Sequence, residues 1–276
     1  MSESLLIARE RDFIEISGPE SRSFLQGQLS QDIENLTEHS GAWSFLLDPS
    51  GLVVAWLRVI CVEENGFILD MDPGFAEGVK DRLSRFLIRT KCSIEISKLN
   101  MYTFLGERDK APEELDGLRS ITIDWPSLEA IDYFTPTHLT APEVHSSDIW
   151  EQIRISVGMP AMGHEITAKT IPAATGLVER SVSFDKGCYT GQELVARVDS
   201  RVAGPPKHLV FLKGSGNPLS PGTVFSHEGK EILELTSVSE GEDEFFALGY
   251  RHRSAENVTE IEQNGSFVQI IRTNLF

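Results

Sequence analysis

Short apolar runs and alternating segments dominate the first third of the chain, a pattern typical of β-strands. Strands are predicted at Arg11–Ile16, Trp43–Leu47, Leu52–Val62 and Phe67–Met71. A turn sequence with Pro and Gly separates the second from the third, and Asn65 with Gly66 is typical of a tight hairpin before the fourth. The last three strands are therefore expected to pair in chain order and antiparallel.

A helix is predicted after the first strand, beginning at the capping box that Ser17 and Glu20 form. Its buried face is expected to hold Phe24, Leu25 and Leu29. Gln26 and Gln28 lie elsewhere on this helix. Residue type alone favours two solvated amides there over a wall of a ligand cavity.

A second helix is predicted after the fourth strand, with Asp72 as its cap and Pro73 at its first position. Its apolar face is expected to hold Val79, Leu83, Phe86 and Leu87. Further strands are predicted at Cys92–Ile96, Met101–Leu105, Ile121–Asp124 and Ile131–Phe134.

A third helix is predicted from about Ser147, with Gly158 at its end and Pro160 preventing its continuation. Ile149, Ile153 and Val157 are expected on one face of it. Met159–Arg180 lacks clear periodicity and is expected to run over the surface as a long loop. After two consecutive prolines, short evenly spaced strands are predicted, a pattern typical of a small barrel. They are His208–Leu212, Thr223–Ser226, Ile232–Val238, Phe245–Tyr250 and Phe267–Arg272.

The composition limits the classes of function. The 276 residues are expected to form two or three units, and the net charge of −17 disfavours non-specific binding to nucleic acid or to anionic membrane. No apolar run is long enough to span a bilayer, and the N-terminus does not resemble a secretion signal. A cytoplasmic protein is expected.

The three cysteines are too few and too scattered for a disulfide framework or a zinc site. Cys61 and Cys92 lie in strand patterns and are expected to be buried. Scattered histidines complete no ligand set, so no protein-bound metal is expected.

The third cysteine, Cys188, lies in Lys186–Arg197, which reads KGCYTGQELVAR. Thr190 and Glu193 match a capping box, which predicts a helix that begins at Gly191. Cys188 would then lie about two residues before a helix N-terminus, where the macrodipole and the nearby Lys186 favour a thiolate.

A structural role is the alternative. Gly187 and Gly191 can serve a turn, and Glu193 and Arg197 are spaced for a surface ion pair. A lone cysteine such as Cys188 is usually a small buried side chain.

Three segments resemble one family. KGCYTGQE with Arg197, FLQGQLSQDI at Phe24–Ile33 and IRISVGMPAMGHEI at Ile153–Ile166 are similar to the motifs of the YgfZ family. That family consists of folate-binding proteins associated with iron–sulfur cluster assembly and maintenance, and it is related to the glycine-cleavage T-protein, an aminomethyltransferase.

The resemblance implies an α+β fold of two related halves and a small C-terminal β-barrel around a central interdomain cavity. Residues 1–204 would form the folate-binding region, with subdomains at about 1–98 and 99–204, and residues 205–276 the barrel. It implies Cys188 and Lys186 as the reactive pair. Folate would contact Arg154, Tyr189, Gln192, Glu193 and Arg197.

The match to the T-protein fails at its carboxylates. Ser156 stands where that enzyme has a glutamate for the pterin, and Leu69–Gly78 lacks its Asn-Ala and Lys-Asp motif, with Glu77 taken as the nearest carboxylate. We therefore expect a tetrahydrofolate-binding accessory protein for iron–sulfur client or assembly proteins. The alternative is a one-carbon transferase of the T-protein type, so the sequence leaves open whether the chain is an enzyme.

Overall fold

The computed structural model describes residues 4–139, 144–199, 204–227, 229–239, 241 and 244–272, apart from the side chains of Glu114 and residues 197–199. The chain divides into two compact units. The first unit comprises residues 1–50, 54–150 and 180–192, and the second comprises residues 51–53, 151–179 and 193–276. The predicted boundaries near residues 98 and 204 stay predictions. None of the described helices is long and apolar enough to cross a membrane.

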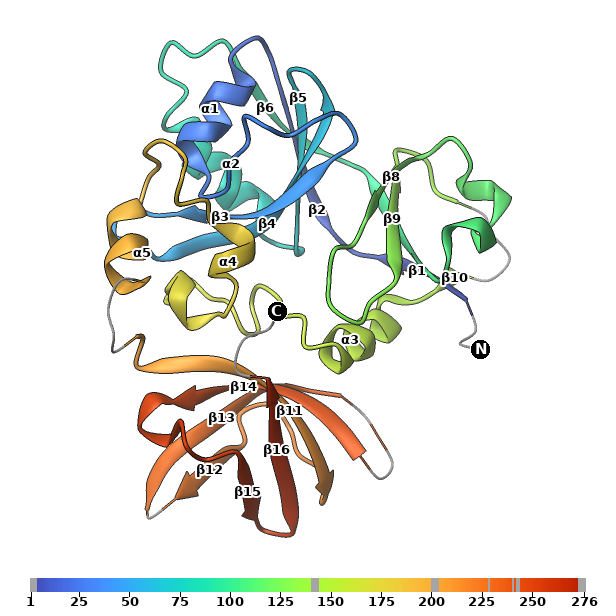
Figure 1. Cartoon of the computed structure of the whole chain (residues 1–276). Helices are drawn as coiled ribbons and strands as arrows, with labels where there is room; N and C mark the ends of the chain where they lie inside the picture. Colours follow the sequence, from blue (N-terminus) through green and yellow to red (C-terminus); the bar gives the residue numbers. More distant parts are fainter. Residues whose placement is uncertain are drawn as a thin grey trace. The chain divides into compact units, whose positions relative to one another are not determined.

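The first unit contains a five-stranded sheet with two helices on one face (Figure 1). In sheet order its strands are β3 (Gly41–Leu47), β4 (Val53–Glu63), β5 (Gly66–Met71), β2 (Asp12–Ser17) and β6 (Ser93–Ser97). Helices α1 (Ser21–Gln28) and α2 (Ala76–Ser84) supply Leu25, Val79 and Leu83 to the core beneath them. The predicted consecutive order of β3, β4 and β5 is confirmed.

A second five-stranded sheet completes the first unit. Its strands are β10 (Val144–His145), β1 (Leu5–Arg9), β7 (Asn100–Leu105), β9 (Ala130–Thr135) and β8 (Arg119–Thr122). Two short 3-10 helices, η1 (Arg108–Lys110) and η2 (Glu113–Leu115), precede β8. Phe13, Ile60 and Ile68 of the first sheet form one apolar cluster with Met101 and Phe134 of the second.

The predicted caps of both helices are wrong. Ser17 is the last residue of β2, and Gly18 has a φ of 125°, so α1 begins only at Ser21. Glu20 accepts a hydrogen bond from the backbone N–H of Lys91 rather than from Ser17.

At α2 the cap comes from another strand. Oδ2 of Asp12 accepts the backbone N–H groups of Gly74, Phe75 and Ala76, each at 2.9 Å. Asp72 is instead paired with Arg11. A cap that is distant in sequence leaves no local pattern, which is why the sequence prediction named the nearer aspartate.

One expectation about burial also needs correction. Cys61 is buried as predicted, but Cys92 precedes β6 and is half-buried. In α3 (Ser147–Ser156) Trp150 and Ile155 are buried, while Ile149 and Ile153, together with Val157 just after the helix, are half-buried. Arg154 of this helix is also buried, and its charge is compensated by an ion pair with Glu165.

The second unit begins with a segment that was expected to be a surface loop. It contains η3 (Pro172–Ala174) and leads into α4 (Val178–Ser181), and it buries Met159, Met162, Ile166 and Leu177. Backbone hydrogen bonds within tight turns, such as Gly163 N–H to Ile166 O at 2.8 Å, make this burial possible. The surface prediction is therefore wrong. Gly158, with a φ of 73°, ends α3 as predicted.

The predicted barrel is confirmed as a nearly closed six-stranded sheet, drawn in orange to red in Figure 1. After α5 (Gln192–Asp199), its strands in sheet order are β12 (Val224–His227), β13 (Lys230–Val238), β14 (Glu244–His252), β11 (Lys207–Gly216), β16 (Ser266–Arg272) and β15 (Glu260–Gln263). A short 3-10 helix, η4 (Arg253–Ala255), follows β14. The Gln263 side chain accepts Ser226 N–H and donates to Val224 O, both at 2.9 Å, and so joins the two edge strands.

Candidate functional site

The KGCYTGQE segment lies in an irregular loop of the first unit in which Lys186 is tightly held. Its Nζ donates to the carbonyl oxygens of Leu29 and Gln31, at 2.7 Å each. Burial lowers the pKa of Lys186 to about 8, although Asp32 and Glu34 act in the opposite direction. Carbonyl dipoles orient the amine but carry no full negative charge, so they offset burial only in part.

Tyr189 and Cys188 lie beside this lysine in sequence and differ in exposure. The Tyr189 ring centroid lies 5.4 Å from Lys186 Nζ and is buried. Burial raises the pKa of Tyr189 to about 12, and its hydroxyl has no hydrogen-bond partner among the described residues. Cys188 is exposed. The loop therefore presents an accessible thiol next to a fixed amine and a protonated phenol.

The helix after the motif begins later than predicted. Gly191 has a φ of 82°, which is not helical, and α5 starts at Gln192. Cys188 thus lies four residues before the first helical residue rather than about two residues outside the helix. The effect of the macrodipole falls off within the first turn of a helix, so it is weaker at this distance than at the predicted distance of about two residues.

Hydrogen bonds attach this loop to the residues that follow α1. Ser183 N–H donates to Ser30 O at 3.0 Å, and the Gln31 side chain donates to Arg180 O at 2.9 Å. The Ser30 hydroxyl donates to Ser181 O at 2.5 Å. Two segments that are distant in sequence, and that both resemble family motifs, therefore form one local structure.

Gln26 helps to shape the same region and is not a solvated amide as expected. It donates to Asp32 at 3.0 Å and accepts Ile33 N–H at 2.7 Å. Burial raises the pKa of Asp32, but hydrogen bonds from Asn35, from Glu34 N–H and from Gln26 outweigh it and lower the pKa. The side-chain oxygen of Gln28 is buried without a partner among the described residues.

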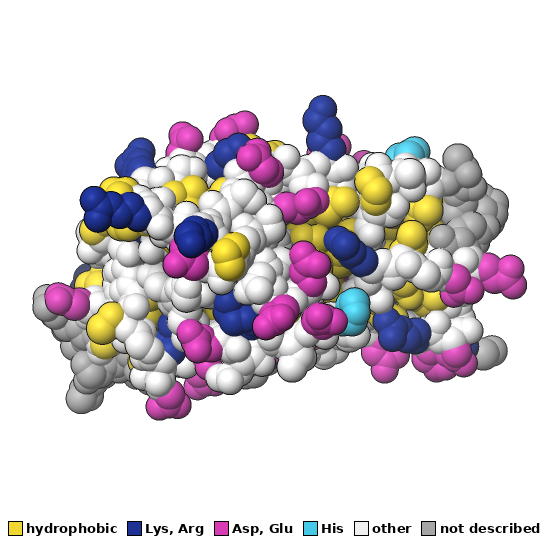
Figure 2. Space-filling view, turned by 90° about the horizontal axis from the view of Figure 1, so that it is seen from above, with side chains coloured by type: hydrophobic (Ala, Val, Ile, Leu, Met, Phe, Trp, Pro, Cys, Tyr) yellow, Lys and Arg dark blue, Asp and Glu magenta, His cyan; other side chains and the backbone are white. Residues whose placement is uncertain are grey.

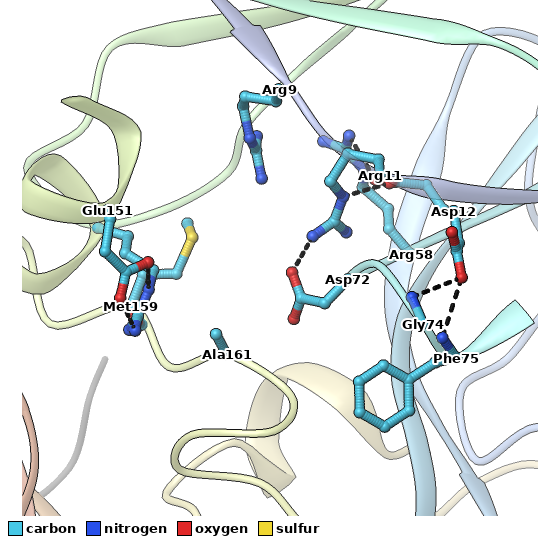
Figure 3. A network of polar contacts seen from close by, with 12 residues as sticks. Arg9, Arg11, Asp12, Arg58, Asp72, Gly74, Phe75, Glu151, Met159 and Ala161 are labelled. Atoms are coloured by element: carbon cyan, nitrogen blue, oxygen red, sulfur yellow. Dashed lines mark hydrogen bonds and ion pairs between the residues drawn. The ribbon is translucent and has the colours of Figure 1, made fainter. Parts of the chain in front are cut away.

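Three arginines and three aspartates form a second polar region, a buried ion network in the first unit. Figure 3 labels Arg9, Arg11, Arg58 and Asp72 of this network. The residues of this network are Arg9, Arg11, Arg58, Asp70, Asp72 and Asp132. Arg58 of β4 pairs with Asp70 of β5 at 2.8 Å and also with Asp132 of β9, so it links the two sheets. Figure 3 shows Arg11 extending to Asp72.

Pairing fixes the charges of this network. Burial raises the pKa of Asp70, but Arg11 and Arg58 lower it further than burial raises it. Burial lowers the pKa of Arg11, and Asp70 and Asp72 reverse that shift. Arg9 is less well compensated, and burial lowers its pKa to about 10. Nε of Arg9 and Nη1 of Arg58 have no partner among the described residues.

A cavity of about 360 Å³ adjoins Arg58 in the first unit and is lined also by Trp43, His39, Asp124 and Arg180. Trp43 stacks on Trp56, with ring centroids 4.2 Å apart and planes 16° apart. The cavity thus combines a flat indole with two guanidinium groups, one of them almost fully buried. Such a lining suits a planar ring that carries a carboxylate.

Arg154 belongs to another buried group, in the second unit. Its guanidinium donates to Met159 O at 3.0 Å, to Glu165 at 3.2 Å and to Ser237 at 3.0 Å, and it pairs with Glu151. These bonds tie α3 to the following turn and to β13. Its expected contact with folate stays a prediction.

The remaining predicted site residues lie at the start of α5. Gln192 is half-buried and Glu193 is exposed, while the side chain of Arg197 lies outside the described residues. Lys186, Cys188, Tyr189 and Gln192 belong to the first unit. Arg154, Glu193 and Arg197 belong to the second, and all these assigned roles stay predictions.

Sequence reasoning missed the ion network, although a signal was present. Arg58 is the one charged residue in the otherwise apolar run LVVAWLRVICV, and a charge in a buried strand requires a buried partner. Asp70 and Asp72 also lie in the stretch for which Glu77 was taken as the nearest carboxylate. Glu77 is an exposed residue of the first turn of α2, and its correspondence to the T-protein motif stays a prediction.

Several bacterial proteins are similar to this chain in sequence. No family model matches the chain. An uncharacterized protein of Haemophilus influenzae is 28% identical over 205 residues, which cover 72% of this chain and 69% of that protein. The tRNA-modifying protein YgfZ of Escherichia coli is 27% identical over 245 residues, which cover 80% of this chain and 72% of that protein.

The solved structure of aminomethyltransferase T of the glycine cleavage system from Bartonella henselae superposes with a TM-score of 0.84. The match covers 100% of this chain and 87% of that chain, at 19% identity, and therefore shows a shared fold. The chain is a homologue of the YgfZ proteins. The expected family resemblance and the expected aminomethyltransferase-like α+β fold with a C-terminal barrel are confirmed.

Proposed function

We propose that this YgfZ homologue binds a reduced folate and supports the assembly or repair of iron–sulfur enzymes through Cys188. The observation that carries the proposal is the conformation of KGCYTGQE, in which Lys186 is fixed by two carbonyl groups and Cys188, two residues later in sequence, is exposed. A lysine that served only as a surface cation would not be desolvated in this way.

Each residue of the loop has a proposed part in this function. Cys188 supplies the thiol that reacts with electrophiles or binds iron, and Lys186 fixes the loop through its two carbonyl contacts. Tyr189 packs beneath Lys186 and limits the access of water to it. The described residues include no group of three or more His, Cys, Asp or Glu side chains that could hold a metal ion, so a cluster is proposed as transient cargo shared with a client.

The cavity beside Trp43 supports the folate part of the proposal. Folate has a planar pterin, which suits the indole face of Trp43, and carboxylates, which suit Arg58 and Arg180. The unpartnered Nη1 of Arg58 is a donor for which the folded chain supplies no acceptor among the described residues. When bound, a reduced folate would supply a carrier for one-carbon units.

An aminomethyl transfer of the T-protein type is less well supported. That chemistry needs a carboxylate next to the folate nitrogen that is free to exchange a proton. Asp70 is neutralised by two arginines, which lower its pKa, and Asp72 is paired with Arg11. The Ser156 hydroxyl donates to Ile153 O within its own helix.

The name of the Escherichia coli relative points to tRNA modification, and we propose that any such role here is indirect. With a net charge of −17, the chain is poorly suited to hold tRNA by its phosphates. A client enzyme that depends on an iron–sulfur cluster would instead carry out the modification.

Anaerobic calorimetry with tetrahydrofolate tests the folate part directly. Wild-type protein is expected to bind, and Trp43→Ala and Arg197→Ala are expected to bind more weakly because each removes a proposed contact. Ser156→Ala and Cys188→Ala are expected to bind normally. Absence of binding by folded wild-type protein, or glycine-cleavage activity of the pure protein, would overturn the proposal.

A further inference from the structure

The loop that joins α2 to β6 combines exposed apolar and basic side chains and contains no acidic residue. Residues Ser84–Lys91 read SRFLIRTK, and we call them the basic loop. Ile88 is 80% exposed and Phe86 is 41% exposed. Of the six large hydrophobic side chains exposed in the described part of the chain, these are two, and Ile88 is the most exposed.

Packing and hydrogen bonds hold the basic loop in place. Leu87 packs against the core of the first unit, while Phe86 N–H donates to Leu83 O at 2.9 Å. The Arg82 guanidinium lies 4.3 Å from the centroid of the Phe86 ring and donates to Leu47 O. A loop fixed in this way loses little conformational entropy when it binds, so the exposed side chains are well suited to contact a partner.

The charge of this region is opposite to that of the chain. Residues 80–98 contain six basic and two acidic residues, whereas the chain as a whole carries a net charge of −17. Arg85, Arg89 and Lys91 of the basic loop are all exposed. Figure 2 shows that the face it draws has interspersed acidic and basic side chains, with hydrophobic side chains reaching the surface between them.

We infer that the basic loop docks an acidic partner protein, with Phe86 and Ile88 as apolar anchors and Arg85, Arg89 and Lys91 facing carboxylates. An apolar centre with a charged rim is the usual composition of a protein interface, and arginine and large apolar side chains supply most of its binding energy. This inference does not depend on the folate or the Cys188 proposals.

Nucleic acid and membrane are less suitable partners. RNA binding relies on aromatic stacking of successive bases together with many phosphate contacts, whereas the basic loop offers one exposed aromatic ring, Phe86. An extended polyanion or an anionic membrane would also be repelled by the acidic body of this chain. An acidic segment of a partner protein, by contrast, needs to contact only the basic loop and not the acidic body of the chain.

Fluorescence anisotropy with a labelled peptide of about ten residues that alternates Glu with Leu tests the inference, since peptide recognition combines charge with apolar anchors. Wild-type protein is expected to bind it, and a Gln–Leu and a Glu–Ser peptide are expected to bind at least about tenfold more weakly, because each lacks one of the two contributions.

Variants with matched controls locate the binding site. The double variants R85E/R89E and F86S/I88S are expected to weaken binding by about tenfold or more, since each removes two contacts. The double variant F267S/I271S alters two exposed apolar residues of the barrel and is expected to bind like wild type. Circular dichroism of each variant checks folding.

Equal binding by wild type and R85E/R89E would overturn the inference. So would tighter binding, through the basic loop, of tRNA or of vesicles that contain phosphatidylserine. The weakening of wild-type binding by salt is expected to be lost in R85E/R89E.

Discussion

The ion network and the KGCYTGQE loop bury polar groups in the same unit with opposite electrostatic results. In the network each aspartate meets at least one arginine, and the pKa of Asp70 falls while that of Arg11 rises. In the loop Lys186 donates to two backbone carbonyl groups, and burial lowers its pKa to about 8 although Asp32 and Glu34 act in the opposite direction. Burial with ion pairing therefore fixes a charge, and burial without it brings a group close to its titration range.

We interpret the buried ion network as a structural feature and the buried lysine of the loop as part of a reactive site. The network joins two sheets through the ion pairs of Arg58 with Asp70 and Asp132. The loop holds a lysine that can lose its proton near neutral pH, next to an accessible thiol. The following predictions test that interpretation, beginning with the largest expected effect.

Removing Arg58 is expected to be the most damaging change. Arg58→Met leaves Asp70 and Asp132 without a shared cation, and breaking a buried pair from one side costs about 3–5 kcal/mol of unfolding free energy. Urea denaturation measures it. Arg85→Met, an exposed arginine after α2, is the control and is expected to change stability by less than about 0.5 kcal/mol. A loss below about 1 kcal/mol in Arg58→Met would mean that the network is not a structural link.

Asp12 differs from the aspartates of the network because its carboxylate accepts hydrogen bonds from three backbone N–H groups. Asp12→Ala removes the acceptor of three N–H groups at the start of α2, and the loss of a helix cap costs about 0.5–2 kcal/mol. The same denaturation assay applies. Asp81→Ala, an exposed position within α2, provides the control, and equal losses in the two variants would contradict the capping role.

The stability of the protein should depend on pH through Lys186. Its pKa is about 8 in the folded chain against 10.5 ordinarily, so between these values the unfolded chain binds the proton more tightly. The free energy of unfolding should therefore rise between pH 8 and 10.5 through this group. In Lys186→Met that contribution should be missing. Parallel pH profiles for wild type and variant would show that burial does not shift this lysine.

Tyr189→Phe should have the smallest effect on stability. The Tyr189 hydroxyl has no partner among the described residues, so its removal leaves no broken hydrogen bond. A change within about 0.5 kcal/mol is expected by the same assay. A loss of several times that size would mean that the hydroxyl is hydrogen-bonded in solution.

Sequence predicted the features of this protein that depend on local pattern. The order of β3, β4 and β5, the end of α3 at Gly158 and the barrel strands other than β15 follow from alternation and turn residues. The site motif was found because KGCYTGQE is contiguous. Its meaning came from a family resemblance, since composition and spacing alone favoured a structural turn over a reactive site.

The features that sequence missed depend on contacts between distant residues. Asp12 caps a helix more than sixty positions later, and Arg58 finds Asp132 on another sheet. Helix α5 begins later than predicted because Gly191 has a positive φ, a local feature that the capping-box pattern does not reveal. The burial of the segment after α3 depends on turn hydrogen bonds that periodicity does not detect.

Complementation tests the proposed function most directly. In a strain that lacks this chain, the activity of iron–sulfur enzymes is measured after expression of wild type, Cys188→Ala or the control Cys92→Ala, each at equal abundance. Wild type and Cys92→Ala are predicted to restore activity, and Cys188→Ala is predicted to fail although it folds and binds folate. Full rescue by Cys188→Ala would contradict the proposal that this exposed thiol carries the function.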